Sequence, residues 1–185
     1  MTNETTDDAS AHSANGARRI APVGAVEFSR PNWRWREGPR GAGPTVIVDI
    51  DGVLADAAGR QHHLDEGDWR SFFDAVGDDP TIDEVERLLE LLAANLLVVL
   101  VTGRPRRIQP QTLAWLERHR VRWDLLIMRE FGDYSDVDRF KRDTLHELLG
   151  DGFDVRLALD DDPKNYAMYV AEGVPCLYVH SGYYA

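Results

Sequence analysis

The sequence contains a single cysteine, Cys176, among its 185 residues. An internal disulfide is therefore excluded, so packing has to supply the stability, and we expect the reducing cytoplasm as the location. No uninterrupted apolar run reaches the roughly 18–20 residues that a membrane-spanning helix needs. The acidic, polar start MTNETTDDAS is unlike a secretory signal. We therefore expect a protein without membrane association.

Lysine is also scarce, and a Gly-Lys pair is absent. The chain has two lysines, Lys141 and Lys164, against 19 arginines. Without a GxxxxGK[ST] motif a Walker-type kinase is excluded, and a net charge of −11 argues against general nucleic-acid binding. Arginine is the default surface cation of this chain, so the compact ammonium of Lys141 indicates a site that uses a point charge.

The first 40 residues differ from the rest in composition. Residues 1–17 are rich in Ser, Thr, Asn, Asp and Ala, which is typical of a disordered tail. Residues 18–40 carry six Arg and three Pro and predict an arm. The arginines and tryptophans of its stretch RPNWRWR could contact phosphates and stack on bases. Alternatively, the aromatic side chains of the arm, Phe28, Trp33 and Trp35, could pack on the surface of the domain, and we favour this packing. Residues 41–185 are expected to form one domain.

From residue 45 onwards, short apolar runs alternate with amphipathic stretches. The runs predict buried strands at 45–50, 96–101, 124–128, 155–159 and 175–180. Apolar residues at helical spacing predict helices near 110–119, 137–149 and after Pro163, and Thr81 with Glu84 predicts a capping box at the start of another. The alternation predicts an α/β fold, a Rossmann-like parallel sheet with helices on both faces and a small insert between strands one and two.

Charged and hydroxyl side chains follow three of these strands where each strand ends. In chain order they are Asp49, Asp51, Thr102, Arg104, Asp160 and Asp161, with Gly103 between Thr102 and Arg104. The carboxyl ends of parallel strands meet at one edge of a sheet, so we expect these residues to lie close together. Two carboxylates 4 Å apart repel by about 4 kcal/mol, so a cation is expected among them. Oxygen-only ligands favour Mg²⁺. A bound Mg²⁺ together with Lys and Arg side chains would make the site positive, so we expect it to bind a phosphate group.

The same motifs resemble the haloacid dehalogenase (HAD) superfamily of phosphatases, and within it the 3′-phosphatase domain of phage-type polynucleotide kinase. The segments that carry the resemblance are VIVDIDGVLAD, VVLVTGRP, MREFGD followed by Lys141, FDVRLALDDD and GVPCLYVHSGYY. The resemblance implies a HAD-like fold and an Mg²⁺-dependent phosphomonoesterase with an aspartyl-phosphate intermediate. It also implies a substrate with a 3′-phosphate, on a polynucleotide end in nucleic-acid repair or on a nucleotide.

The resemblance implies a role for each of these residues. Asp49 would be the nucleophile, and Asp51 the general acid and base, with a pKa raised by neighbouring carboxylates. The residues that would hold phosphoryl oxygens are Thr102 and Lys141. The residues that would bind substrate are Gly103, Arg104 and Arg129, although Arg104 could instead pair with the aspartates. The metal ligands would be Asp49, the Asp51 carbonyl, Asp161 and Asp160, with the choice of direct ligand between the last two left open.

Two other functions remain open at this point. One is a small-metabolite phosphatase with the same core, because residues 55–80 form a short, distinct insert and such inserts shape substrate choice. Asp162 also stands where the family has basic character, which weakens the case for a polynucleotide substrate. The other is a metal-binding, non-catalytic interaction module that joins a repair complex through its arm.

Overall fold

The computed structural model describes residues 30–130, 132–133 and 135–184. The predicted tail and the beginning of the predicted arm, including Phe28, lie outside the described residues. Within the described residues, no helix combines the length and the apolar character that crossing a membrane requires.

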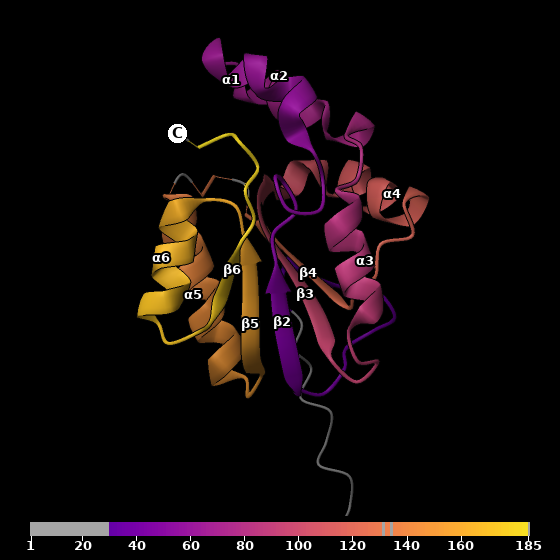
Figure 1. The fold of residues 1–185 in the computed structure, drawn as a ribbon, viewed down its shortest axis with the longest axis vertical. Coiled ribbons are helices and arrows are strands. Elements are labelled where there is room, and N and C mark those ends of the chain that lie inside the picture. The colour runs from indigo at the N-terminus through magenta and orange to yellow at the C-terminus, as the bar shows by residue number, and fades with distance from the viewer. Residues whose placement is uncertain (1–29, 131, 134, 185) are drawn as a thin grey trace, which may run out of the picture.

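Six strands form one sheet in the order β1-β4-β3-β2-β5-β6 (Figure 1). Their bounds are β1 Trp33–Trp35, β2 Pro44–Val48, β3 Leu97–Pro105, β4 Leu125–Arg129, β5 Asp154–Asp160 and β6 Cys176–Tyr178. Strands β2 to β6 pair in parallel, whereas β1 is antiparallel to β4. The Rossmann-like α/β fold is confirmed, in a mixed sheet whose strands are mostly parallel.

Helices cover both faces of the sheet. Figure 1 shows α3 and α4 on one face and α5 and α6 on the other. Their bounds are α3 Asp83–Leu91, α4 Gln109–Arg118, α5 Val137–Gly150 and α6 Pro163–Ala171. Val46 and Val48 of β2 belong to the core beneath α3 and α4, and Ile47 between them belongs to the core beneath α5 and α6. Burial on both faces explains why the strands are continuously apolar.

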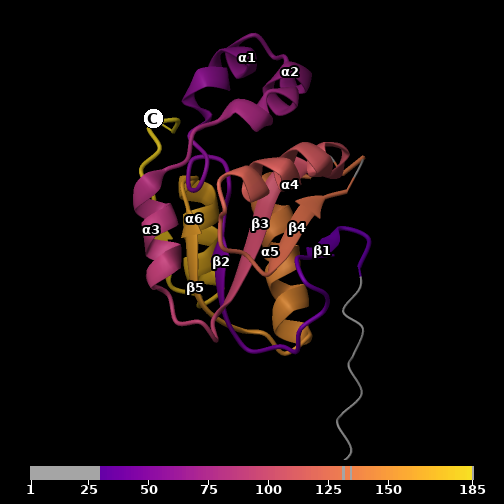
Figure 2. The same ribbon diagram turned by 90° about the vertical axis from the view of Figure 1, so that its right-hand side faces the viewer.

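A small insert follows β2 and lies above the carboxyl ends of the parallel strands (Figure 2). It consists of η1 Ala57–Arg60, α1 Gln61–Asp65, α2 Trp69–Asp74 and η2 Val76–Asp78. The chain then returns through a backbone bridge between Ala55 and Thr81, and the Ile82 amide donates to the Leu54 carbonyl at 2.8 Å. The insert therefore places additional side chains over the edge of the sheet where ligands of such folds bind.

The start of α3 differs from the prediction. The N-cap residue is Ile82, which makes no side-chain cap, and the Thr81 hydroxyl donates to the Asp83 carboxylate at 3.1 Å. The predicted capping box of Thr81 and Glu84 is therefore wrong. Pairing with Leu54 and Ala55 holds Thr81 and Ile82 extended. Acidic residues in the first turn of α3 complement the helix dipole instead.

Strand β1 is an element that the sequence patterns do not predict. Trp33 and Trp35 are both buried and pack on Phe153, with ring centroids 6.0 and 6.3 Å away. Three residues are too few for a periodicity to show, and Pro31 and Pro39 flank them. These residues of the arm pack as the edge strand of the sheet.

Replacing Trp33 with alanine should lower the free energy of unfolding by about 3 kcal/mol, because it removes a buried indole from the edge of the core. Equilibrium urea denaturation measures this change. Arg34→Ala, at the exposed position between the two tryptophans, is the matched control and should shift stability by less than about 0.5 kcal/mol. Equal losses in both variants would contradict the packing role of Trp33.

Candidate active site

Three carboxylates meet at the carboxyl edge of the sheet. Asp49 directly follows β2, Asp160 ends β5, and Asp161 comes next. One carboxylate oxygen from each residue lies within 4.8 Å of those of the other two, and all three residues are buried. The parallel topology thus brings together aspartates that are more than 100 residues apart in the sequence.

Lys141 from α5 lies beneath this group. Its ammonium donates to Asp49 Oδ2 at 2.7 Å and to Asp160 Oδ2 at 2.6 Å, and its side chain is fully buried. Burial disfavours the ammonium, but Asp160 and Asp49 outweigh that effect and raise the pKa of Lys141 well above its ordinary value. The lysine therefore stays charged and neutralises part of the acidic group.

The carboxylates themselves are only partly neutralised. Burial raises the pKa of Asp49 well above its usual range, and the repulsion from Asp160 and Asp161 adds to this, although Lys141 opposes it. Burial also raises the pKa of Asp161 to about 7, and a hydrogen bond from Ser181 offsets only part of that rise. One ammonium is thus too little positive charge for three buried carboxylates.

The oxygens at this site fit a hard divalent cation. Asp160 uses Oδ1 to accept from Asn165 Nδ2 at 2.9 Å and from the Asp162 amide at 3.1 Å, while its Oδ2 accepts from Lys141. By contrast, Asp161 Oδ2 is buried and has no hydrogen-bond partner among the described residues. A buried carboxylate oxygen without a partner is costly, and an oxygen-only donor set is the kind that binds Mg²⁺.

Gly52 makes room for the unpartnered oxygen. It has a left-handed backbone, with φ of +78°, and a Cβ placed on it would lie 1.9 Å from Asp161 Oδ2. Any side chain at this position would therefore displace the Asp161 carboxylate. The glycine after Asp51 is thus required by both the turn and the site.

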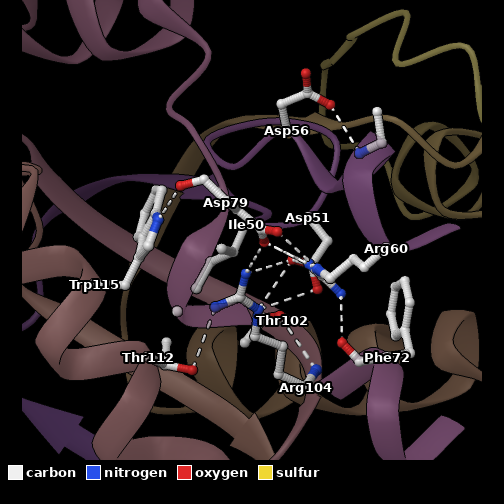
Figure 3. Close-up of polar contacts among 12 residues, drawn as sticks. Ile50, Asp51, Asp56, Arg60, Phe72, Asp79, Thr102, Arg104, Thr112 and Trp115 are labelled. Carbon is white, nitrogen blue, oxygen red and sulfur yellow. Dashed lines mark hydrogen bonds and ion pairs between the residues drawn. The ribbon is translucent and has the colours of Figure 1, made fainter. Parts of the chain in front are cut away.

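Asp51 has a different environment from Asp49, although the two are separated by one residue. Figure 3 shows the surroundings of Asp51. Its carboxylate accepts from Arg104 Nε at 3.0 and 3.1 Å and also from Arg60 Nη2. Burial would raise the pKa of Asp51, but Arg104 and Arg60 outweigh it and lower the pKa below its usual range. The expectation that neighbouring carboxylates raise this pKa is wrong, because arginines surround the carboxylate of Asp51.

Both arginines also contact the carboxylate of a second acidic residue, Asp79. Arg60 Nε donates to both Asp79 oxygens at 2.9 and 3.0 Å, and Arg104 Nη2 lies 3.3 Å from Asp79 Oδ2. The Arg60 guanidinium also packs 4.1 Å from the centre of the Phe72 ring, and Trp115 Nε1 donates to the Asp79 carbonyl at 2.7 Å. The insert and α4 therefore fix both arginines against Asp51, as Figure 3 shows.

Sequence patterns do not predict Arg60 or Asp79 as site residues. Both lie between β2 and α3, where no motif spacing points to them, and the chain contains many other arginines and aspartates. Their burial, at 2% and 6% exposure, is what distinguishes them, and a sequence alone does not show it.

The remaining predicted residues divide into two groups. Thr102 is fully buried in β3 and its hydroxyl accepts from the Arg104 amide at 3.2 Å. Arg104 is fully buried and its guanidinium donates to Asp51, so it pairs with an aspartate, as the sequence analysis gave as the alternative to substrate binding. Gly103 and Arg129 line one cavity beside the aspartates, and Arg129 donates to the carbonyls of its own loop. Their parts in substrate binding stay predictions.

Replacing Asp161 with asparagine should stabilise the chelator-treated protein at pH 8 by on the order of 4 kcal/mol. With the pKa of Asp161 at about 7, the folded state binds more protons than the unfolded state between pH 4 and 7. The wild type therefore loses stability as pH rises, and the advantage of the variant should vanish near pH 4. Urea denaturation across pH measures this.

The matched control is Asp65→Asn, which removes an exposed carboxylate from α1. Added Mg²⁺ should stabilise the wild type and the control but not Asp161→Asn. A pH-independent difference between wild type and Asp161→Asn, or the same response of all three proteins to Mg²⁺, would contradict the assignment.

Comparison with known proteins agrees with this geometry. A family model described as the polynucleotide kinase PNKP phosphatase domain matches residues 43–184. A chain in the structure of the Pnkp1/Rnl/Hen1 RNA repair complex is 26% identical with a TM-score of 0.64, over 74% of this chain and 42% of that one. A chain in another Pnkp1/Rnl/Hen1 complex is 24% identical with a TM-score of 0.65, over 83% and 50%.

This chain therefore spans half or less of the length of those two relatives. The fold is also shared with a putative phosphoglycolate phosphatase from Lactobacillus plantarum, at 13% identity and a TM-score of 0.55, over 76% of this chain and 88% of that one. The family match covers nearly all of the described residues. The chain belongs to the family of PNKP-type phosphatase domains, which are phosphatases of the HAD superfamily.

Proposed function

We propose that the chain is an Mg²⁺-dependent phosphomonoesterase that removes a 3′-phosphate from a polynucleotide end or a nucleotide. The observation that carries the proposal is the buried group of Asp49, Asp160, Asp161 and Lys141 at the carboxyl edge of the sheet. Membership of the PNKP phosphatase family supports the substrate class. A relative of this chain in an RNA repair complex supports the same class.

In this proposal Asp49 is the nucleophile. Its carboxylate attacks phosphorus, the bond to the leaving alkoxide breaks, and an aspartyl-phosphate forms. Burial raises the pKa of Asp49, so the attacking anion depends on positive charge beside it, which Lys141 provides at 2.7 Å. An Mg²⁺ ion held by Asp49 and Asp161 would supply the further positive charge that offsets repulsion between the carboxylate and the phosphate.

Asp51 acts in both steps of the proposed reaction. It donates a proton to the leaving alkoxide, and it later accepts a proton from the water that hydrolyses the aspartyl-phosphate. Arg104 and Arg60 lower the pKa of Asp51, whereas a phosphate dianion bound nearby would raise it by like-charge repulsion. The arginines also hold the Asp51 carboxylate in one orientation, so Arg60, Arg104 and Asp79 act as positioning residues.

Replacing Asp49 with asparagine should reduce phosphate release from a 3′-phosphorylated oligonucleotide by at least about 1,000-fold, because the amide cannot attack phosphorus. Release of inorganic phosphate with Mg²⁺ present measures this, and circular dichroism checks the fold. The control Asp65→Asn keeps full activity. Unchanged turnover in Asp49→Asn would overturn the nucleophile assignment.

The same assay separates the alternatives. Hydrolysis of sugar phosphates without hydrolysis of the oligonucleotide would favour a small-metabolite phosphatase. Absence of phosphate release from any ester by the wild type with Mg²⁺ would contradict the proposed function and favour a non-catalytic module.

The general-acid role of Asp51 predicts a dependence on the leaving group. Asp51→Asn should slow release from an alkyl phosphate by about 10²–10⁴-fold, because an alkoxide needs a proton to depart. An aryl phosphate with a nitrophenolate leaving group needs no such proton, so formation of its aspartyl-phosphate should be much less affected. A burst of nitrophenolate in stopped flow measures this first step. Equal slowing of both substrates would contradict the general-acid role.

A further inference from the structure

A cavity of about 720 Å³ adjoins the proposed phosphate site. Its walls come from α2 of the insert, from the end of β3 and Arg107 after it, from Arg129 at the end of β4, and from the start of α5. The loop between β4 and α5 also lines it, with the acidic residues Glu130, Asp133 and Asp136. Its volume lies within the range of ~300–1,000 Å³ that is typical of sites for small molecules. The aspartates that would bind metal do not line it, so it is a separate space beside the reacting atoms.

The inner end of the cavity adjoins the proposed catalytic residues. Gly103 lines it, between Thr102, which would hold a phosphoryl oxygen, and Arg104, which holds Asp51. Val137 also lines it, one helical turn before Lys141 on α5. A Cβ at Gly103 would lie 3.4 Å from both methyl groups of Val137, so a larger residue would crowd this end. The cavity therefore begins beside the strand end that carries Thr102 and Arg104.

The outer wall of the cavity is aromatic. Trp69 and Phe73 of α2 line it, with ring centroids 6.1 Å apart. Trp69 is 59% exposed, although its neighbour Phe72 is buried. Trp69 therefore lines the cavity while most of its surface remains in water, so its indole adds little to the core.

Helix α2, which carries Trp69 and Phe73, contacts a residue that follows β3. Arg107, which follows β3, forms an ion pair with Asp74 and donates to the Arg70 carbonyl at 3.4 Å. Both contacts join α2 to the strand end that carries Thr102. They therefore connect the helix that carries Trp69 to the side of the sheet where the phosphate site lies. Arg70, beside Trp69, has a side chain that is 87% exposed.

We propose that this cavity binds the terminal nucleoside of a single-stranded, 3′-phosphorylated nucleic-acid end, with its base stacked on Trp69. The proposal rests on the proposed function, because the nucleoside is then the leaving group that Asp51 protonates. Stacking on an aromatic ring accepts every base, and an adjacent arginine meets the backbone phosphate. Trp69 is thus a specificity residue that distinguishes a nucleic-acid end from a small phosphate ester, and Arg70 contacts the next phosphate.

The test compares two substrates in Trp69→Ala, Trp69→Phe and a matched control. The control is Leu91→Ala, because Leu91 is an exposed apolar residue, 77% exposed, at the end of α3. The substrates are a 3′-phosphorylated oligonucleotide and glycerol 2-phosphate, which has no base to stack. The ratio of their kcat/KM values should fall about tenfold in Trp69→Ala, mainly through the KM of the oligonucleotide. It should be largely retained in Trp69→Phe and unchanged in Leu91→Ala.

A binding measurement separates this inference from the proposed function. Fluorescence anisotropy of a labelled single-stranded oligonucleotide needs no turnover, and its dissociation constant should rise about tenfold in Trp69→Ala. If Trp69→Ala changes neither the dissociation constant of the oligonucleotide nor the ratio of the kcat/KM values, the inference is overturned. The same result is expected if Trp69 contacts a protein and not a base. A wild type that binds the oligonucleotide through Trp69 but releases no phosphate would contradict the proposed function and leave the binding site standing.

Discussion

The constraint on which this structure depends is a shortage of positive charge in a buried space. Asp49, Asp160 and Asp161 share that space with one ammonium, which pairs with the first two. Asp161 Oδ2 has no partner within the described part of the chain. Two carboxylates about 4 Å apart repel by about 4 kcal/mol at the effective dielectric of a protein surface. Such an arrangement is stable at neutral pH when a cation completes it.

The same strand end supplies two carboxylates with opposite surroundings. Asp49 faces other acids, whereas Asp51 faces Arg60 and Arg104. Because adjacent carboxylates differ in this way, one can serve as a nucleophile beside a metal while the other handles protons. Arg60 and Asp79 come from the insert, so the insert takes part in positioning Asp51 as well as covering the site.

The sequence predicted what depends on local pattern and parallel topology. The apolar runs indicated β2 to β6, and strand-end residues such as Asp49 and Asp160 lie together because parallel strands end at one edge. It did not predict β1, because three residues show no period. It named Arg104 as a possible partner of the aspartates but did not predict Arg60, because only burial and long-range pairing distinguish Arg60 from the many other arginines of the chain. The chemical roles of these residues remain predictions.

We propose that a single divalent cation completes the group of three aspartates. A crystal of the wild-type protein grown with Mn²⁺, measured at the manganese absorption edge, provides the test. We expect one anomalous peak per chain at this group, with oxygens of Asp49 and Asp161 in the coordination sphere and Lys141 still on Asp160. No peak there at saturating Mn²⁺, or a peak held by other residues instead, would contradict it.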